Sequence, residues 1–337
     1  MTQRLLTVDN LKVSFAAREG ENQAVRGVSF HIDAGETLGI VGESGSGKSV
    51  TAKAIMSLIA PPGRITSGEI TLGGTSLTGL SEKEWRRLRG NRIAMVFQDP
   101  MTSLNPVKTI GQQLTEVIRR HRGLKKDAAY AEAAELLRQV GIRDPEQRLK
   151  QYPHEFSGGM RQRVMIAMAL SCKPELLLAD EPTTALDATI QAQILDLFKD
   201  LKANTQTAVA LITHDLGVVA QVCTRVIVMY GGLIMEEGTV EDIFYRPQHP
   251  YTIGLLRSLP KRGGGSRERL VPIEGTPPDL LNPPPGCPFM ERCPHAHARC
   301  ASLPPVTELA PGHRTMCWLA VEQQEKAAAG SEGGNAE

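Results

Sequence analysis

The chain has 337 residues, with 38 Lys and Arg side chains against 37 Asp and Glu, which gives a formal net charge of +1 at pH 7. This balance provides no general attraction for nucleic acid, so no nucleic-acid partner is expected. No apolar stretch approaches the roughly 20 residues needed to cross a bilayer. The start, MTQRLLTVDN, also lacks the apolar core of a signal peptide. We therefore expect a cytosolic protein that reaches a membrane only through a partner.

The N-terminal part alternates β-forming and polar residues, as in 11–15 and 25–32, which predicts antiparallel strands. Short apolar runs then follow, separated by segments of helix length. This arrangement is typical of a buried parallel sheet with helices on both faces. The runs lie at 37–41, 92–97, 176–179, 208–213 and 225–229. The predicted fold class is therefore α/β.

Helical periods rich in Ala, Glu, Gln and Arg fill 99–170, which predicts a helical subdomain inserted between the two core segments, 1–98 and 171–259. After these, the sequence KRGGGSRER reads as a linker, followed by a stretch rich in proline and cysteine. We expect a small, loop-rich extension at 260–320 and a disordered tail at 321–337.

The clearest motif is a phosphate-binding loop of the form G-x-x-x-x-G-K-S, which follows the apolar run 37–41 and precedes a helix-prone segment. Glycines let the backbone N–H groups approach a phosphate closely, and the following helix adds its positive end. Lys48 can reach the β- and γ-phosphates of ATP, and the Ser49 hydroxyl can bind Mg²⁺. The motif comprises Gly42, Glu43, Ser44, Gly45, Ser46, Gly47, Lys48 and Ser49.

A second apolar run, LLLA, ends in the two carboxylates Asp180 and Glu181. Downstream of a phosphate-binding loop, this pattern predicts that Asp180 holds the Mg²⁺ shell and that Glu181 polarises the attacking water. Alone, the pair would indicate only a helix cap.

The segment Phe156-Ser157-Gly158-Gly159-Met160 precedes that run, and there the chain resembles the ABC ATPase family with its LSGGQ signature. The resemblance implies a P-loop NTPase fold with a RecA-like core, an antiparallel β-subdomain and an inserted helical subdomain. It also implies that Ser157, Gly158 and Gly159 face the γ-phosphate held by a second subunit. Phe156 replaces Leu and Met160 replaces Gln, and the loss of the amide predicts a weaker composite site.

Three further positions match the family in order. Gln98 resembles the glutamine that senses Mg²⁺ and the water, and His214 resembles the histidine that aligns Glu181. Ala185-Leu186-Asp187 resembles the D-loop. Phe15 is the aromatic residue expected to stack on adenine, with Phe30 as a competitor.

The stretches QDPMTSLNP, ADEPTTALD, ITHDLGVVA and the His249-Pro250-Tyr251 segment resemble the larger ATPase subunit of bacterial oligopeptide and dipeptide importers. This resemblance implies a second ATPase, two integral permeases, an extracytoplasmic peptide-binding protein and a place on the cytoplasmic face of the inner membrane. The helical insertion is expected to form a groove for a permease helix. Importers of nickel chelates or glutathione, a soluble ABC ATPase and a redox-sensing module remain alternatives.

Four cysteines cluster in the proline-rich extension, a segment too small to build its own core. Their spacing lacks the C-x2-C pairs usual for zinc, and His295 or His297 could replace one thiolate. The importer resemblance implies a [4Fe-4S] cluster, with zinc and free thiols or disulfides as alternatives. The four are Cys287, Cys293, Cys300 and Cys317.

Overall fold

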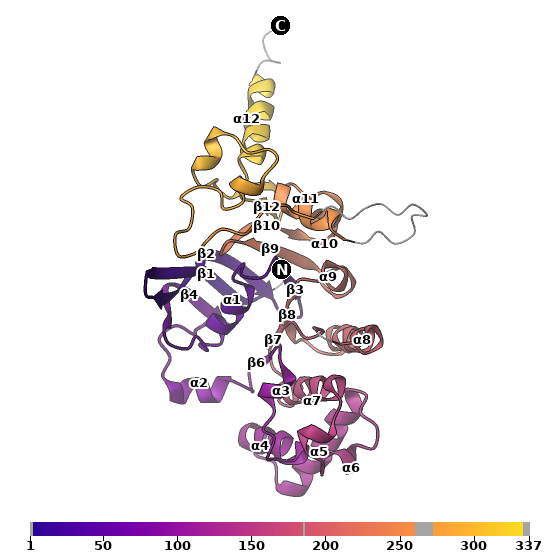
Figure 1. The fold of residues 1–337 in the computed structure, drawn as a ribbon. Coiled ribbons are helices and arrows are strands. Elements are labelled where there is room, and N and C mark those ends of the chain that lie inside the picture. Colours follow the sequence, from indigo (N-terminus) through magenta and orange to yellow (C-terminus); the bar gives the residue numbers. More distant parts are fainter. Residues whose placement is uncertain (1–2, 185, 260–271, 333–337) are drawn as a thin grey trace, which may run out of the picture.

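The computed structural model describes residues 3–184, 186–259 and 272–332. Two sheets and several groups of helices stack along one long axis, and the C-terminal helix projects from one end (Figure 1). The larger sheet has the strand order β11-β12-β10-β9-β3-β8-β7-β6. Its strands are β3 (Thr37–Val41), β6 (Ile93–Val96), β7 (Leu176–Asp180), β8 (Ala208–Ile212), β9 (Arg225–Tyr230), β10 (Leu233–Thr239), β11 (Thr307–Ala310) and β12 (His313–Thr315).

Five consecutive strands at one end of this sheet, β9, β3, β8, β7 and β6, are the five apolar runs of the sequence, and they pair in parallel. Every residue of β3, β7 and β8 is buried, as expected for strands covered on both faces. The helices α1 (Lys48–Ile55), α8 (Ala188–Asn204) and α9 (Leu216–Val222) follow β3, β7 and β8. The predicted α/β fold of the P-loop class is confirmed.

A smaller antiparallel sheet has the order β2-β1-β4-β5 and shares one apolar cluster with strands of the larger sheet. Its strands are β1 (Arg4–Ala17), β2 (Gly20–Asp33), β4 (Gly63–Leu72) and β5 (Thr75–Ser76). Leu6, Leu11 and Ile32 are fully buried and join Ile55 of α1 in one apolar cluster. This cluster fixes the β-subdomain against α1, the helix that follows the phosphate-binding loop.

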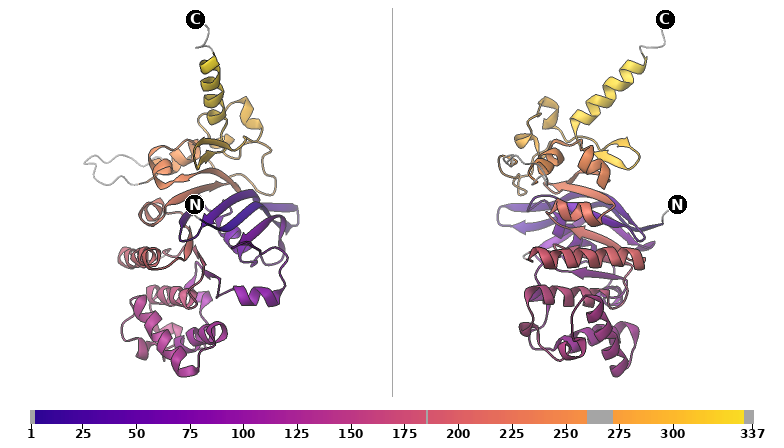
Figure 2. Two further views of the ribbon diagram at one scale, coloured as in Figure 1. Left: turned by 180° about the vertical axis from the view of Figure 1, so that it is seen from behind. Right: turned by 90° about the vertical axis from the view of Figure 1, so that its right-hand side faces the viewer.

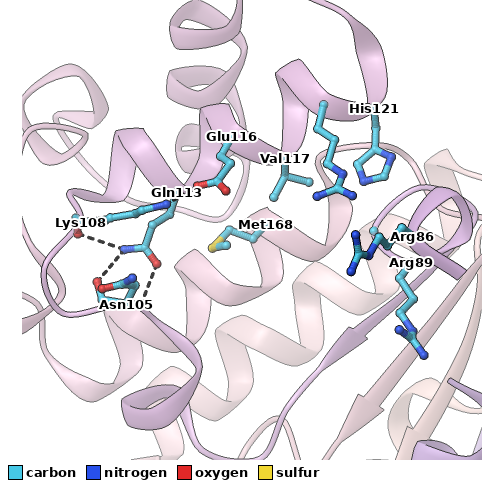
Figure 3. Close-up of a pocket in the computed structure, with 11 residues that line it drawn as sticks. Arg86, Arg89, Asn105, Lys108, Gln113, Glu116, Val117, His121 and Met168 are labelled. Atoms are coloured by element: carbon cyan, nitrogen blue, oxygen red, sulfur yellow. Dashed lines mark hydrogen bonds and ion pairs between the residues drawn. The ribbon is translucent and has the colours of Figure 1, made fainter. Parts of the chain in front are cut away.

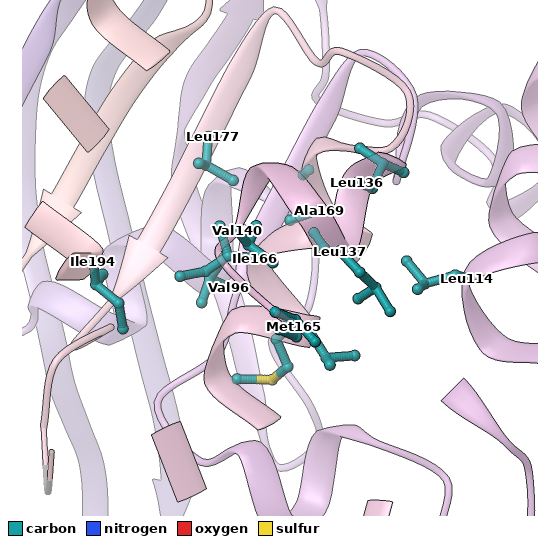
Figure 4. Packing of buried hydrophobic residues seen from close by; sticks show 14 of the residues in the cluster. Val96, Leu114, Leu136, Leu137, Val140, Met165, Ile166, Ala169, Leu177 and Ile194 are labelled. Atoms are coloured by element: carbon teal, nitrogen blue, oxygen red, sulfur yellow. The ribbon is translucent and has the colours of Figure 1, made fainter. Parts of the chain in front are cut away.

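Helices occupy most of the span 100–170 and lie at the far end of the parallel sheet from the extension (Figure 1). Their core is one apolar cluster in which Leu114, Leu137 and Ile166 are fully buried, and it continues to Val96 and Leu177 of the sheet (Figure 4). The helices are α3 (Pro100–Ser103), α4 (Ile110–Arg122), α5 (Lys126–Gln139), α6 (Pro145–Arg148) and α7 (Gly158–Leu170), with α2 (Glu82–Leu88) beside them.

In the C-terminal extension, residues 272–306 are mostly turns and irregular segments, and a short hairpin follows them. This hairpin, β11–β12, joins the main sheet, because β12 pairs with β10 through Glu236 and Thr315. Helices α10 (Val240–Tyr245) and α11 (Pro250–Arg257) and short turns at Met290–Arg292 and Ala298–Ala301 complete this end. The extension therefore continues the core of the protein, and its linker at 260–271 lies outside the described residues.

The prediction of a disordered tail at 321–337 is wrong for its first part, since helix α12 runs from Trp318 to Glu332 (Figure 2). Contacts with residues outside the helix anchor its first turns: the Trp318 indole donates to the Ser302 carbonyl at 3.0 Å, and Arg299 pairs with Glu325 at 3.0 Å. An alanine-rich segment with such anchors favours helix over coil. Residues 333–337 lie outside the described part.

None of the helices in the described ranges is long and apolar enough to cross a membrane.

Candidate nucleotide site

The phosphate-binding loop connects β3 to α1, and its shape depends on close backbone approaches. Gly47 caps α1 with φ 99°, and a Cβ there would lie 2.5 Å from the Ala24 carbonyl oxygen of β2. Lys48 folds back over the loop, and its Nζ donates to the Gly42 and Glu43 carbonyls at 2.7 and 2.8 Å. Burial lowers the pKa of Lys48, against the opposing effect of nearby carboxylates that include Glu181. The loop therefore surrounds the Lys48 ammonium group, which can bind phosphate oxygens in place of these two carbonyls.

Asp180 ends β7 beside the start of α1. The Ser49 hydroxyl donates to its carboxylate at 2.7 Å. Burial raises the pKa of Asp180, and the hydrogen bond from Ser49 opposes this effect. A hydroxyl and a carboxylate in contact are the oxygen donors that Mg²⁺ prefers. These two residues fit the expected magnesium site.

Glu181 has the backbone of a constrained position, with φ 48° in the left-handed region, which non-glycine residues rarely adopt. Its carboxylate accepts hydrogen bonds from Gln98 at 2.9 Å and Thr184 at 2.8 Å, and lies 3.2 Å from Nδ1 of His214. Burial would raise the pKa of Glu181, but the contacts with Thr184, His214 and Lys48 hold it below its ordinary value. The structure therefore brings Gln98, Glu181 and His214 together and keeps the glutamate ionised.

One cavity of about 600 Å³ contains most of the predicted nucleotide-binding residues. Phe15 lines it while remaining partly exposed, whereas Phe30 is only 5% exposed and belongs to the apolar core. This placement favours Phe15 over Phe30 as the aromatic partner of a base. The other predicted residues that line the cavity are Ser44, Gly45, Ser46, Gly47, Lys48, Ser49, Gln98 and Glu181.

The Ser-Gly-Gly signature does not line this cavity. Ser157 caps α7 by accepting the Met160 N–H at 3.3 Å, and Ser157 and Gly158 are exposed. A Cβ on Gly159 would lie 2.9 Å from the Ile190 side chain, so a larger residue here would displace Ile190. Within one chain the signature is an exposed helix start. Ala185, in the expected D-loop, lies outside the described residues.

Sequence reasoning missed the residues that hold the second loop position, Glu43. The Tyr251 hydroxyl accepts the Glu43 N–H at 2.9 Å, and Arg292 binds the Glu43 carboxylate at 2.7 and 3.1 Å. Tyr251 belongs to the His-Pro-Tyr segment, in which His249 caps α11 by accepting the Tyr251 N–H at 3.0 Å. This segment therefore supports the phosphate-binding loop. No periodic signal in the sequence connects residues so far apart.

The four clustered cysteines come together in the extension. Cys287 donates its N–H to the Cys300 carbonyl at 3.0 Å, and three of the four side chains are 8% exposed. Burial, with a smaller contribution from the other three thiols, raises the pKa of Cys287 to about 12. Across the ranges that the structure describes, no group of three or more His, Cys, Asp or Glu is arranged so that it could hold a metal ion. The structure thus gathers the thiols without forming a closed single-ion site.

A separate groove lies between α2 and α4 (Figure 3). Arg86 of α2 and Arg89, which follows α2, line one side of it, and Lys108, Glu116 and His121 line the other side, from α4 and the turn before it. Gln113 holds one rim, because its amide donates to the Asn105 and Lys108 carbonyls at 3.1 and 3.0 Å. The groove therefore lies between the helical subdomain and α2, which precedes that subdomain in the sequence.

An ATP-binding cassette is defined by the phosphate-binding loop, the paired carboxylates Asp180 and Glu181, and the Ser-Gly-Gly signature. The family described as ABC transporter matches residues 25–184, and the oligopeptide/dipeptide transporter C-terminal region matches residues 235–300. The chain belongs to the ABC transporter ATP-binding proteins of the oligopeptide and dipeptide importer family. It is accordingly an ABC-type ATPase, in which ATP hydrolysis is coupled to transport.

Its relatives include the dipeptide transport ATP-binding protein DppD of Bacillus subtilis, 56% identical over 96% of this chain and 97% of that protein. The oligopeptide transport ATP-binding protein OppD of Salmonella typhimurium is 53% identical, covering 95% of each. Among solved structures, the dimeric cassette MJ0796 bound to ADP and Pi has a TM-score of 0.64 at 29% identity, covering 70% of this chain and 99% of that one.

Proposed function

We propose that this protein supplies the ATP-driven step of peptide uptake across the cytoplasmic membrane. Relatives above 50% identity carry oligopeptide or dipeptide transport in their names, and the match includes the C-terminal region specific to such transporters. Importers of nickel chelates or glutathione remain the second candidate, because cargo contacts belong to other subunits. Growth of a deletion strain on peptides of graded length tests the cargo. Unchanged peptide uptake in that strain would contradict a peptide cargo.

The observation that carries the ATPase function is the position of Glu181 beside the phosphate-binding loop. In this proposal Lys48 binds the β- and γ-phosphates, and Ser49, Asp180 and Gln98 hold Mg²⁺, which neutralises phosphate charge when bound. The Glu181 carboxylate accepts a proton from the attacking water, and His214 orients the Glu181 side chain. Thr184 adds a hydrogen bond that keeps this carboxylate ionised.

The exposed signature suggests a site shared between two subunits. Ser157, Gly158 and Gly159 would complete the ATP site of a second, homologous ATPase, whose own signature would complete the site of this chain. A serine hydroxyl and free N–H groups at a helix start suit the γ-phosphate. The dimeric form of the related cassette MJ0796 supports this arrangement.

Partners at the membrane would use the groove between α2 and α4. We propose that it accepts a short helix of either of two integral permeases, which would place the protein on the cytoplasmic face of the inner membrane. An extracytoplasmic peptide-binding protein would deliver cargo to the same assembly. Isolation of the tagged protein from membranes, followed by identification of the accompanying subunits, tests this assignment.

We also propose that Cys287, Cys293, Cys300 and Cys317 hold a [4Fe-4S] cluster that stabilises the extension. The four thiols lie close enough for each ionised one to raise the pKa of its neighbours. Thiolates at a single zinc ion would have to sit closer together than thiolates around a cluster, which is larger. Zinc and free thiols are the alternatives.

Replacement Glu181→Gln tests the ATPase mechanism. Because the amide keeps the size of the side chain but accepts no proton, we expect ATP binding to persist and phosphate release to fall by about 100-fold or more. Glu69→Gln, an exposed position on β4, is the matched control and is expected to hydrolyse ATP normally. Normal turnover in Glu181→Gln would remove Glu181 from this role.

A further inference from the structure

The nucleotide cavity has one wall that does not come from the cassette core. Pro277, Pro278, Asp279 and Leu280 of the C-terminal extension line the same cavity as Phe15 and the phosphate-binding loop. This orange segment runs from the extension down to the edge of strands β1 and β2 (Figure 1). Residues more than 200 positions after the loop thus border its ligand space.

Hydrogen bonds hold this segment at both ends. At its start, Arg292 donates to the Ile273 and Glu274 carbonyls at 3.0 and 2.8 Å. At its end, the Leu280 carbonyl accepts the Gln23 N–H of β2 at 2.8 Å. The wall is therefore fastened to the β-subdomain and, through Arg292, to the loop residue Glu43.

Packing fixes the middle of the wall. A Cβ on Gly231 would lie 3.3 Å from Pro278 and 2.9 Å from Pro288, so the turn after β9 accepts both prolines only because it carries no side chain. Two successive prolines also limit the backbone freedom of the segment. When a binding surface is already ordered, ligand binding costs no further conformational entropy of that surface.

The chemistry of this wall suits the base of a nucleotide. Purine faces are flat and apolar, and the cavity offers the Phe15 ring together with proline rings and the Leu280 side chain. The phosphates would occupy the other part of the cavity, at Lys48 and Ser49. We propose that the segment Pro277–Leu280 binds the base and ribose end of ATP. This inference rests on the proposed ATPase function, and it gives the extension a direct role in nucleotide affinity.

Binding measurements with two ligands test the proposal. Inorganic tripolyphosphate engages only the phosphate-binding loop, whereas ATP also engages the wall. Replacing Leu280 by Ala, or Pro278 by Ala, is expected to weaken ATP binding about fivefold through lost apolar contact. Tripolyphosphate binding is expected to stay unchanged. Pro285→Ala, exposed in the same extension and away from the cavity, is the matched control and is expected to bind both ligands normally.

Equal weakening for both ligands would mean that the variants only loosen the loop, and unchanged ATP binding would mean that the wall does not touch the base. Either result overturns the inference. If Leu280→Ala alters the unfolding curve, Pro277→Ala takes its place, because Pro277 is exposed and lines the cavity. A native protein that binds no ATP would instead overturn the ATPase function, so the two failures are distinguishable.

Discussion

Arg292 of the C-terminal extension and Glu43 of the phosphate-binding loop form an ion pair with two hydrogen bonds of 2.7 and 3.1 Å, although 249 positions separate them. Arg292 also donates to the Tyr230 hydroxyl at 3.0 Å and is 6% exposed in its side chain. Burial would lower the pKa of Arg292, but the bonds to Glu43 and Tyr230 outweigh it and raise the pKa. The extension therefore supports the ATP site structurally.

Loss of this ion pair is expected to destabilise the protein. Arg292→Met leaves the Glu43 carboxylate partly buried without its partner, and in a double-mutant cycle with Glu43→Gln we expect a coupling energy of about 2 kcal/mol. Midpoints of urea unfolding measure it. The pair Arg299–Glu325 has similar geometry, at 3.0 and 3.1 Å, but is exposed. The cycle Arg299→Met with Glu325→Gln is the control and is expected to give little coupling. Equal coupling in both cycles would contradict a structural role for Arg292.

His249 is expected to make stability depend on pH in the acid range. Burial lowers its pKa to about 4 in the folded protein, despite the nearby Glu236 carboxylate. Between about pH 6.5 and 4 the unfolded chain therefore binds a proton that the folded protein excludes. Stability should fall as the pH drops through that window, by at most about 3 kcal/mol from this group, and it should be independent of His249 above it.

His249→Asn keeps an acceptor for the Tyr251 N–H but removes the titrating ring. Urea unfolding from pH 4 to 8 should give a flatter stability curve for this variant than for the parent. His154→Asn, at an exposed histidine, serves as the control and should keep the parental curve. A parental curve for His249→Asn would show that other groups cause the acid dependence.

The proposed [4Fe-4S] cluster at the four cysteines predicts a coloured protein. Purified without oxygen, it should contain iron and sulfide and absorb visible light, because thiolate-bound clusters have charge-transfer bands. Cys293→Ser should lose most of this absorbance, while Cys172→Ser, at a cysteine outside the cluster, should keep it. A colourless protein that contains zinc would contradict the iron assignment.

Sequence patterns were sufficient for the parts of the protein that are local or follow each other in a fixed order. The five apolar runs became parallel strands because buried strands read as continuous apolar segments. Asp180 and Glu181 were found at the end of one apolar run and Lys48 in the loop after another, and parallel strands end at one edge of the sheet. Local chemistry and strand order together determine that edge.

Other features depended on contacts that no local pattern encodes. Phe15 and Phe30 both occupy apolar positions in alternating β-strand sequences. Only packing shows that Phe15 lines the cavity and that Phe30 lies in the core. The helix at 321–332 looked like a polar tail because its anchors, Arg299 and Ser302, lie in another segment.

The phosphate-binding loop shows both kinds of information. Its motif determined that it binds phosphate, since spacing and residue type are sufficient for that chemistry. Only the tertiary structure decided that Tyr251 and Arg292 contact Glu43 of this loop and that Pro277–Leu280 line its cavity. Those residues are remote in sequence and have no shared periodicity, so their proximity arises solely from the way the sheet edge and the extension fold together.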